Sequence, residues 1–102
     1  MKRIRLKANE RKQQMIEAGV VLAHNYGIKA LTRAALAAET GTTEGLVNRY
    51  FGNRAGMREE IIVEGIMRKD AQIVAWAIKD GYQVEAPREL LREANRIAPT
   101  LS

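Results

Sequence analysis

The stretch LTRAALAAETGTTEGLVNRYFGNRAGM, residues 31–57, breaks a helical pattern with glycine and then resumes it. Thr32 is a good N-cap for a short alanine-rich helix that the first glycine ends, and Thr43 can cap a second short helix. In the second helix Val47 and Phe51 are four positions apart and therefore share one apolar face. Two short helices joined by a tight glycine turn predict a helix-turn-helix, whose second helix enters the DNA major groove.

The charge distribution favours the same interpretation. Residues 1–58 carry eleven basic and four acidic side chains, whereas residues 59–102 carry six basic and eight acidic ones. Clustered Lys and Arg gain free energy by neutralising phosphates and releasing counterions, so the first half is expected to face a polyanion. Two plainer alternatives stay open at this point: a basic tail that is only solvated, and a helical hairpin that binds nothing.

Every strong periodic pattern in the chain is helical, so an all-α fold in one domain is expected. We predict a three-helix helix-turn-helix domain followed by a long fourth helix and a short C-terminal helix. Gly27 should end the first helix, and Pro87 should open the last one. The predicted helices cover residues 10–26, 33–40, 44–51, 55–79 and 87–98. The expected organisation is a basic arm over 1–9, the DNA-binding domain over 10–58 and a helical dimerisation region over 59–102.

Several classes of function lack their usual residues. The chain has no cysteine and a single histidine, His24, which we interpret as an ordinary residue at a helix end. Neither a thiolate metal site nor a cysteine nucleophile is therefore available. The sequence shows no signal peptide, no membrane span and no phosphate-binding glycine loop. We expect a cytoplasmic protein that is not an enzyme and that needs no cofactor or metal.

The same residues resemble the DNA-binding domain of the tetracycline-repressor (TetR) family. The resemblance covers about residues 11–64, and the helix that ends at Gly27 fits it as well. Two positions depart from the family pattern: Thr42 replaces a small aliphatic residue, and Asn48 replaces a Tyr that typically touches phosphate. The matching positions are Thr32, Leu36, Ala37, Gly41, Thr43, Gly45, Val47, Asn48, Tyr50, Phe51 and Arg54.

The resemblance and helix geometry together imply which side chains contact DNA. The exposed face of residues 43–50, which includes Gly45, should meet base edges. Arg49 is the best candidate for a guanine contact, with a phosphate contact as the alternative. Leu46 is expected either on thymine methyl groups or partly in the core, and Glu44 either on cytosine or as a favourable charge at the helix N-terminus. Backbone contacts are expected from Thr32, Arg33, Thr43, Asn48, Tyr50 and Arg54, and from the arm residues Lys2, Arg3, Arg5 and Lys7 unless the arm is only a solubilising tail.

A homodimer is the expected assembly, because one helix-turn-helix reads few base pairs and two heads can read a palindrome. The later part of the predicted helix over residues 55–79 also carries more apolar side chains than the short C-terminal helix can cover, and a second copy of the chain would bury them. The predicted dimer interface consists of Ile66, Ile73, Val74, Trp76, Ala77, Ile78, Leu90 and Leu91.

The leading hypothesis is a dimeric, sequence-specific transcriptional regulator, most simply a repressor that occupies a palindromic operator. One alternative keeps DNA binding but serves replication, partition or packaging on a mobile element. Another is a small protein-interaction module such as an antitoxin. Family members usually carry a large C-terminal domain that binds an inducer, whereas only residues 65–102 follow the match here. We therefore do not expect an inducer to bind.

Overall fold

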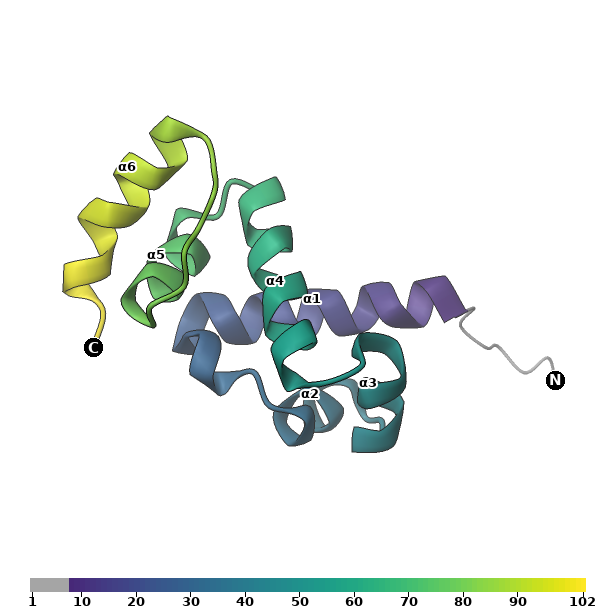
Figure 1. Ribbon diagram of the computed structural model, residues 1–102. Coiled ribbons are helices and arrows are strands. Elements are labelled where there is room, and N and C mark those ends of the chain that lie inside the picture. The colour runs from purple at the N-terminus through teal and green to yellow at the C-terminus, as the bar shows by residue number, and fades with distance from the viewer. Residues whose placement is uncertain (1–7) are drawn as a thin grey trace, which may run out of the picture.

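The computed structural model describes residues 8–102, and within that range it is helical with no strand (Figure 1). The predicted all-α class and the three-helix arrangement at the start of the fold are confirmed. None of the described helices combines the length and hydropathy needed to cross a bilayer. The elements are α1 (Ala8–Tyr26), the 3-10 turn η1 (Ile28–Ala30), α2 (Arg33–Thr40), α3 (Glu44–Phe51), α4 (Arg54–Met67), α5 (Ala71–Lys79), α6 (Arg88–Ile97) and the 3-10 turn η2 (Ala98–Thr100).

The main core lies where α2, α3 and α4 pack against α1. Met15 of α1, Leu36 of α2, Val47 of α3 and Ile61 of α4 are all fully buried in one cluster. The cluster continues beyond α4 as far as Ala77 of α5. The expected boundary between residues 58 and 59 therefore falls inside one continuous core.

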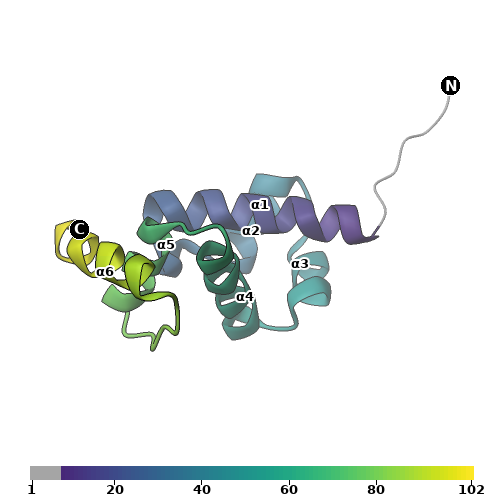
Figure 2. The same cartoon turned by 90° about the horizontal axis from the view of Figure 1, so that it is seen from above.

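A smaller cluster joins α5 to α6 at the other end of the molecule. It is built from Val74, Ala75, Leu90 and Ala94. Both views place α5 and α6 beside the C-terminal end of α1, whereas α3 lies towards its N-terminal part (Figure 1 and Figure 2). The helix α1 thus connects the helix-turn-helix end with the α5–α6 end.

The expectation of one long helix over residues 55–79 is wrong, because the chain breaks between α4 and α5. Lys69 adopts a left-handed conformation with φ 56°, and the Asp70 carboxylate then caps α5 by accepting from the amides of Gln72 and Ile73. The turn folds α5 back onto α4, where Gly65 faces Ile73. A β-carbon at Gly65 would lie 2.6 Å from Cγ2 of Ile73, so the glycine permits this close approach.

Candidate nucleic-acid interface

Each of the two short helices α2 and α3 begins with a side-chain cap, and a glycine turn joins them. Thr32 accepts a hydrogen bond from the Ala35 amide at 3.1 Å, and Thr43 accepts one from the Leu46 amide at 3.2 Å. Both hydroxyls therefore act as the predicted N-caps. Gly41 ends α2 with φ 64°, a conformation that side-chain-bearing residues adopt reluctantly. The turn sets the angle between α2 and α3, and with it the direction in which α3 projects.

Helix α3 buries one face and leaves the other open. Val47 and Phe51 are buried, as the four-residue spacing predicts. Arg49 is exposed on the opposite side, together with Thr43, Glu44 and Gly45. The remaining predicted contact residues, Leu46, Asn48 and Tyr50, are half-buried.

The structure bears directly on the two interpretations of Leu46. Its side chain packs against the main core cluster but keeps part of its surface exposed, as does that of Tyr50. Leu46 is thus partly a core residue, and only its remaining surface is available to a ligand. The arm residues Lys2, Arg3, Arg5 and Lys7 lie outside the described residues.

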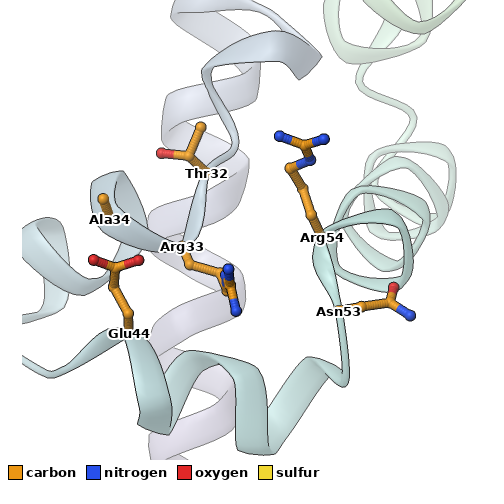
Figure 3. A pocket seen from close by; sticks show the side chains of 6 residues that line it. All are labelled: Thr32, Arg33, Ala34, Glu44, Asn53 and Arg54. Atoms are coloured by element: carbon orange, nitrogen blue, oxygen red, sulfur yellow. The ribbon is translucent and has the colours of Figure 1, made fainter.

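A hollow of about 440 Å³ opens beside α3 where the first residues of α2, α3 and α4 come together. Its lining consists of Thr32, Arg33, Ala34, Glu44, Asn53 and Arg54. Figure 3 shows the side chains of Arg33 and Arg54 on opposite sides of this hollow. Because helix N-termini carry partial positive charge, the backbone adds to the charge of the two arginines.

The arginines of this hollow have no acidic partner within residues 8–102. Neither Arg33 nor Arg54 forms a hydrogen bond or ion pair there, and the same is true of Arg49 on α3. Glu44 also lines the hollow and opposes an anion, but it makes no ion pair with Arg33. The three guanidinium groups are therefore free to bind an incoming anion.

One basic side chain that the sequence analysis did not single out, Arg58, holds the segment that leads into α2. Arg58 of α4 donates from Nε to the carbonyl of Leu31 at 3.0 Å and from Nη2 to the carbonyl of Lys29 at 3.2 Å. Both carbonyls belong to the segment that leads into α2. No local sequence pattern signals a contact between residues 27 and 29 positions apart, so inspection of the motif alone could not find it.

The opposite end of α4 is held by paired charges. Arg68, just after α4, donates to both carboxylate oxygens of Glu17 on α1 and to Glu64 on α4, the latter at 2.8 Å. The hydrogen bonds from Arg68, and then one from Gln13, lower the pKa of the Glu17 carboxyl. The hydrogen bonds that Arg68 donates to Glu17, and then the one to Glu64, raise the pKa of Arg68 in turn. These contacts fix α4 against α1.

The last turn of α1 contacts α5 through His24, in the helix-end position that was predicted for it. Its Nδ1 lies 2.8 Å from Oδ2 of Asp70, and its carbonyl accepts from Gln72 at 2.9 Å and from Trp76 Nε1 at 3.1 Å. The described residues gather no three His, Asp or Glu side chains into a group that could hold a metal ion. His24 therefore connects two helices in this structure.

The predicted dimer interface needs correction. Ile73, Val74 and Ala77 of α5 are fully buried inside a single chain, because α1, α4 and α6 pack against α5. Leu90 of α6 is also buried, in the cluster that α6 forms with α5. The premise that these side chains require a second copy to cover them is wrong. Ile66, Trp76, Ile78 and Leu91 keep partly exposed surfaces.

The most exposed large apolar side chains were not among the predicted interface residues. Val63 and Met67 on α4 are 52% and 72% exposed, and Val21 and Tyr26 on α1 are 55% and 69% exposed. Val63 borders a groove of about 420 Å³ between α4 and residues 82–85. The large apolar side chains that are more than half exposed thus lie on α4 and α1 rather than on α5 and α6.

The comparison with known proteins bears on residues 15–61, which match the family model described as bacterial regulatory proteins, tetR family. The chain is 32% identical over 69 residues to the HTH-type transcriptional regulator BetI of Vibrio atlanticus (strain LGP32), covering 68% of this chain and 34% of that protein. It is 30% identical over 63 residues to the HTH-type transcriptional regulator BetI of Vibrio campbellii (strain ATCC BAA-1116), covering 62% and 32%. The chain thus matches about a third of the length of these relatives, and no solved structure matches it significantly.

Proposed function

Since residues 15–61 match the family model of bacterial regulatory proteins, tetR family, and contain the helix-turn-helix, we propose that the protein is a sequence-specific DNA-binding transcriptional regulator. The observation that carries the proposal is the hollow in which Arg33 and Arg54 face each other without an acidic partner, next to the exposed face of α3. The two relatives named above are described as transcriptional regulators of the helix-turn-helix type. The proposal includes a cytoplasmic location and no catalytic activity.

In this proposal the exposed face of α3 reads bases. Arg49 projects from that face and its guanidinium fork matches O6 and N7 of guanine in the major groove. Glu44 can accept from cytosine N4, or it can act only as a favourable charge in the first turn of α3. The exposed part of Leu46 is placed to contact a thymine methyl group.

The phosphate backbone is contacted by residues around the base-reading helix. Arg33 and Arg54 approach it from the two sides of the hollow, where the first amides of α2 and α4 also point. The hydroxyls of Thr32 and Thr43 can cap their helices and meet phosphate at the same time. Asn48 and Tyr50 complete the proposed backbone contacts, and Lys2, Arg3 and Arg5 are proposed to follow the DNA from the N-terminal arm.

We further propose that two copies bind a palindromic operator and repress a promoter by occupying it. Two heads separated by about one helical turn of DNA, roughly 34–36 Å, read more base pairs than one head can. Because Ile73, Val74 and Ala77 are buried within one chain, the partly exposed residues Ile66 and Leu91 are the better candidates for the proposed interface. No inducer is included in this proposal.

The decisive experiment is selection of bound sequences from a random DNA pool at near-physiological salt, with the mass of the free and bound protein measured in solution. Enrichment of a palindrome by two copies is the expected result. Loss of binding on raising the salt, with no enriched sequence, would contradict sequence-specific regulation. Arg49→Ala should then cost about tenfold or more in affinity for the selected site, and an unchanged affinity would remove Arg49 from the base contacts.

A further inference from the structure

Arg58 lies one helical turn after Arg54, yet the two side chains serve different contacts. Arg54 lines the hollow, whereas Arg58 reaches back to the main-chain carbonyls of Leu31 and Lys29. Residues four apart in a helix lie on the same face, so the same face of α4 carries both groups. One side of α4 thus lines the hollow and also contacts the segment that leads into α2, whose first residues line the hollow as well.

The two carbonyls lie immediately before the start of α2. Leu31 precedes Thr32, the N-cap, and Arg33 is the first residue of the helix. A guanidinium that holds the Leu31 carbonyl therefore sets the separation between α4 and the first residues of α2. Because Arg33 and Arg54 face each other across that separation, its width decides whether both can reach the same stretch of an anionic backbone (Figure 3).

The chemistry of the contact points to positioning rather than to charge pairing. Arg58 is half-buried and makes no ion pair with any carboxylate in residues 8–102. Its donors go to carbonyl groups, which have fixed places in the backbone, and a planar guanidinium can hold two of them at once. A lysine ammonium also has several donors, but they radiate from one nitrogen, so it could not reproduce the two separated donors of the guanidinium fork.

We infer that Arg58 is a positioning residue for DNA binding, which holds the start of α2 at the distance where Arg33 and Arg54 contact one segment of DNA backbone from two sides. The inference rests on the proposed function. It deepens that function by naming a residue that acts on the phosphate contact without touching DNA. Removing Arg58 should therefore weaken the phosphate contact of Arg33 and leave the contact of Arg49 with DNA unchanged.

The test is a double-mutant cycle on the affinity for a duplex of arbitrary sequence at low salt, because phosphate contacts do not depend on sequence. The variants are Arg58→Ala, Arg33→Ala and their combination, with Arg49→Ala as a second background. Arg92→Ala on α6 removes the same charge from an exposed site that makes no recorded contact, and it serves as the matched control. All measurements are made at temperatures where circular dichroism shows each variant folded.

Arg58→Ala should weaken binding about tenfold, comparable to one charge-assisted hydrogen bond, and should reduce the slope of log K against log salt by about one. Adding Arg58→Ala to Arg33→Ala should change the affinity no further, whereas adding it to Arg49→Ala should still cost the full factor. Arg92→Ala should stay within about twofold of the wild type at the salt slope of the wild type. A purely structural role would lower the affinity equally in both backgrounds.

Equal losses in the two backgrounds, or an effect no larger than that of Arg92→Ala, would overturn the inference. The same cycle is measured with Arg58→Lys, which should lose part of the affinity for the duplex. If Arg58→Ala does not fold, the coupling between Arg58→Lys and Arg33→Ala tests the inference instead. If the wild type binds no duplex even at low salt, the proposed function fails. If the wild type binds and the cycle shows no coupling, only the role of Arg58 fails.

Discussion

The two ends of α4 use charge in opposite ways. At its N-terminal end Arg54 faces Arg33 across an open hollow, and neither arginine meets a carboxylate of residues 8–102. At its C-terminal end Arg68 is bound by Glu17 and Glu64, and Asp70 is bound by His24. One end keeps its arginines available, whereas the other pairs Arg68 and Asp70 with side chains of α1 and α4.

The difference separates affinity from stability. An exposed arginine without a partner adds almost nothing to folding and can bind a phosphate when one arrives. The ion pairs between α1, α4 and the start of α5 fix these helices against one another. Their positive charges are already neutralised by carboxylates and therefore attract an anionic ligand less. Substitutions at the first end should therefore change DNA affinity without changing stability, and substitutions at the second end should do the reverse.

The largest effect is expected from the double variant Arg33→Ala with Arg54→Ala. Losing two charge-assisted phosphate contacts should weaken DNA binding by about 100-fold at low salt, while the melting temperature stays close to that of the wild type. Gel-shift titration and calorimetry give the two quantities. Arg88→Ala with Arg92→Ala removes the same charge from α6 and should have little effect on binding. Equal losses from both pairs would mean that overall charge, not the hollow, accounts for the affinity.

Gly65→Ala should have the next largest effect, and it should act on stability. The added β-carbon would lie 2.6 Å from Cγ2 of Ile73, and the resulting overpacking should lower the free energy of unfolding by about 1–3 kcal/mol. Urea denaturation followed by circular dichroism measures it. Gly45→Ala is the control, since a β-carbon there meets only Thr43 Oγ1 at 3.9 Å and should stabilise α3 by up to about 1 kcal/mol. If both variants unfold alike, the α4–α5 contact is not close.

Asp70→Ala should cost about 1 kcal/mol of unfolding free energy, because it removes the N-cap of α5 and the partner of His24. Asp80, at the other end of α5, offers a comparison within one helix. Its Oδ2 is buried without a hydrogen-bond partner, and its negative charge lies at the unfavourable end of the helix dipole. Asp80→Ala should therefore leave stability unchanged or raise it. A larger loss from Asp80→Ala than from Asp70→Ala would contradict the assigned contacts.

The smallest expected effect is on the loss of thermal stability at acidic pH. The hydrogen bonds from Arg68 and Gln13 lower the pKa of Glu17 below its ordinary value of 4.5 in the folded state. The contribution of Glu17 is therefore present above pH 4.5 and is lost as the pH falls through the lowered folded-state value. Wild-type protein should lose slightly more melting temperature than Glu17→Gln between pH 6 and pH 3. Because this carboxylate is 53% exposed, identical losses would show that water screens the pair completely.

Short-range sequence patterns predicted the helix-turn-helix end of the fold well. Caps at Thr32 and Thr43 and the spacing of Val47 and Phe51 depend only on neighbouring residues, so the sequence itself carries the information. The choice of contact residues on the exposed face of α3 stays a prediction.

The other end of α4 was predicted less well, because its determinants are tertiary. The apolar residues Ile66 and Ile73, on either side of residues 68–70, keep a helical spacing of seven, and no glycine or proline marks the break. The one usable signal was Asp70, which is a good N-cap before an apolar run. The folding back of α5 then buries Ile73 and Val74 within the chain, an outcome that helix periodicity alone cannot distinguish from burial in a dimer.

Trp76 gives the junction between α1 and α5 a built-in spectroscopic signal. It is the single tryptophan of the sequence, and its indole lies over Gly27, where a β-carbon would be only 2.9 Å from Cε3. Its Nε1 donates to the last turn of α1. Any separation of α5 from α1 would break that bond, admit water to the ring and shift the fluorescence emission to longer wavelength. Movements at this end of the molecule can thus be followed during DNA binding without attaching a label.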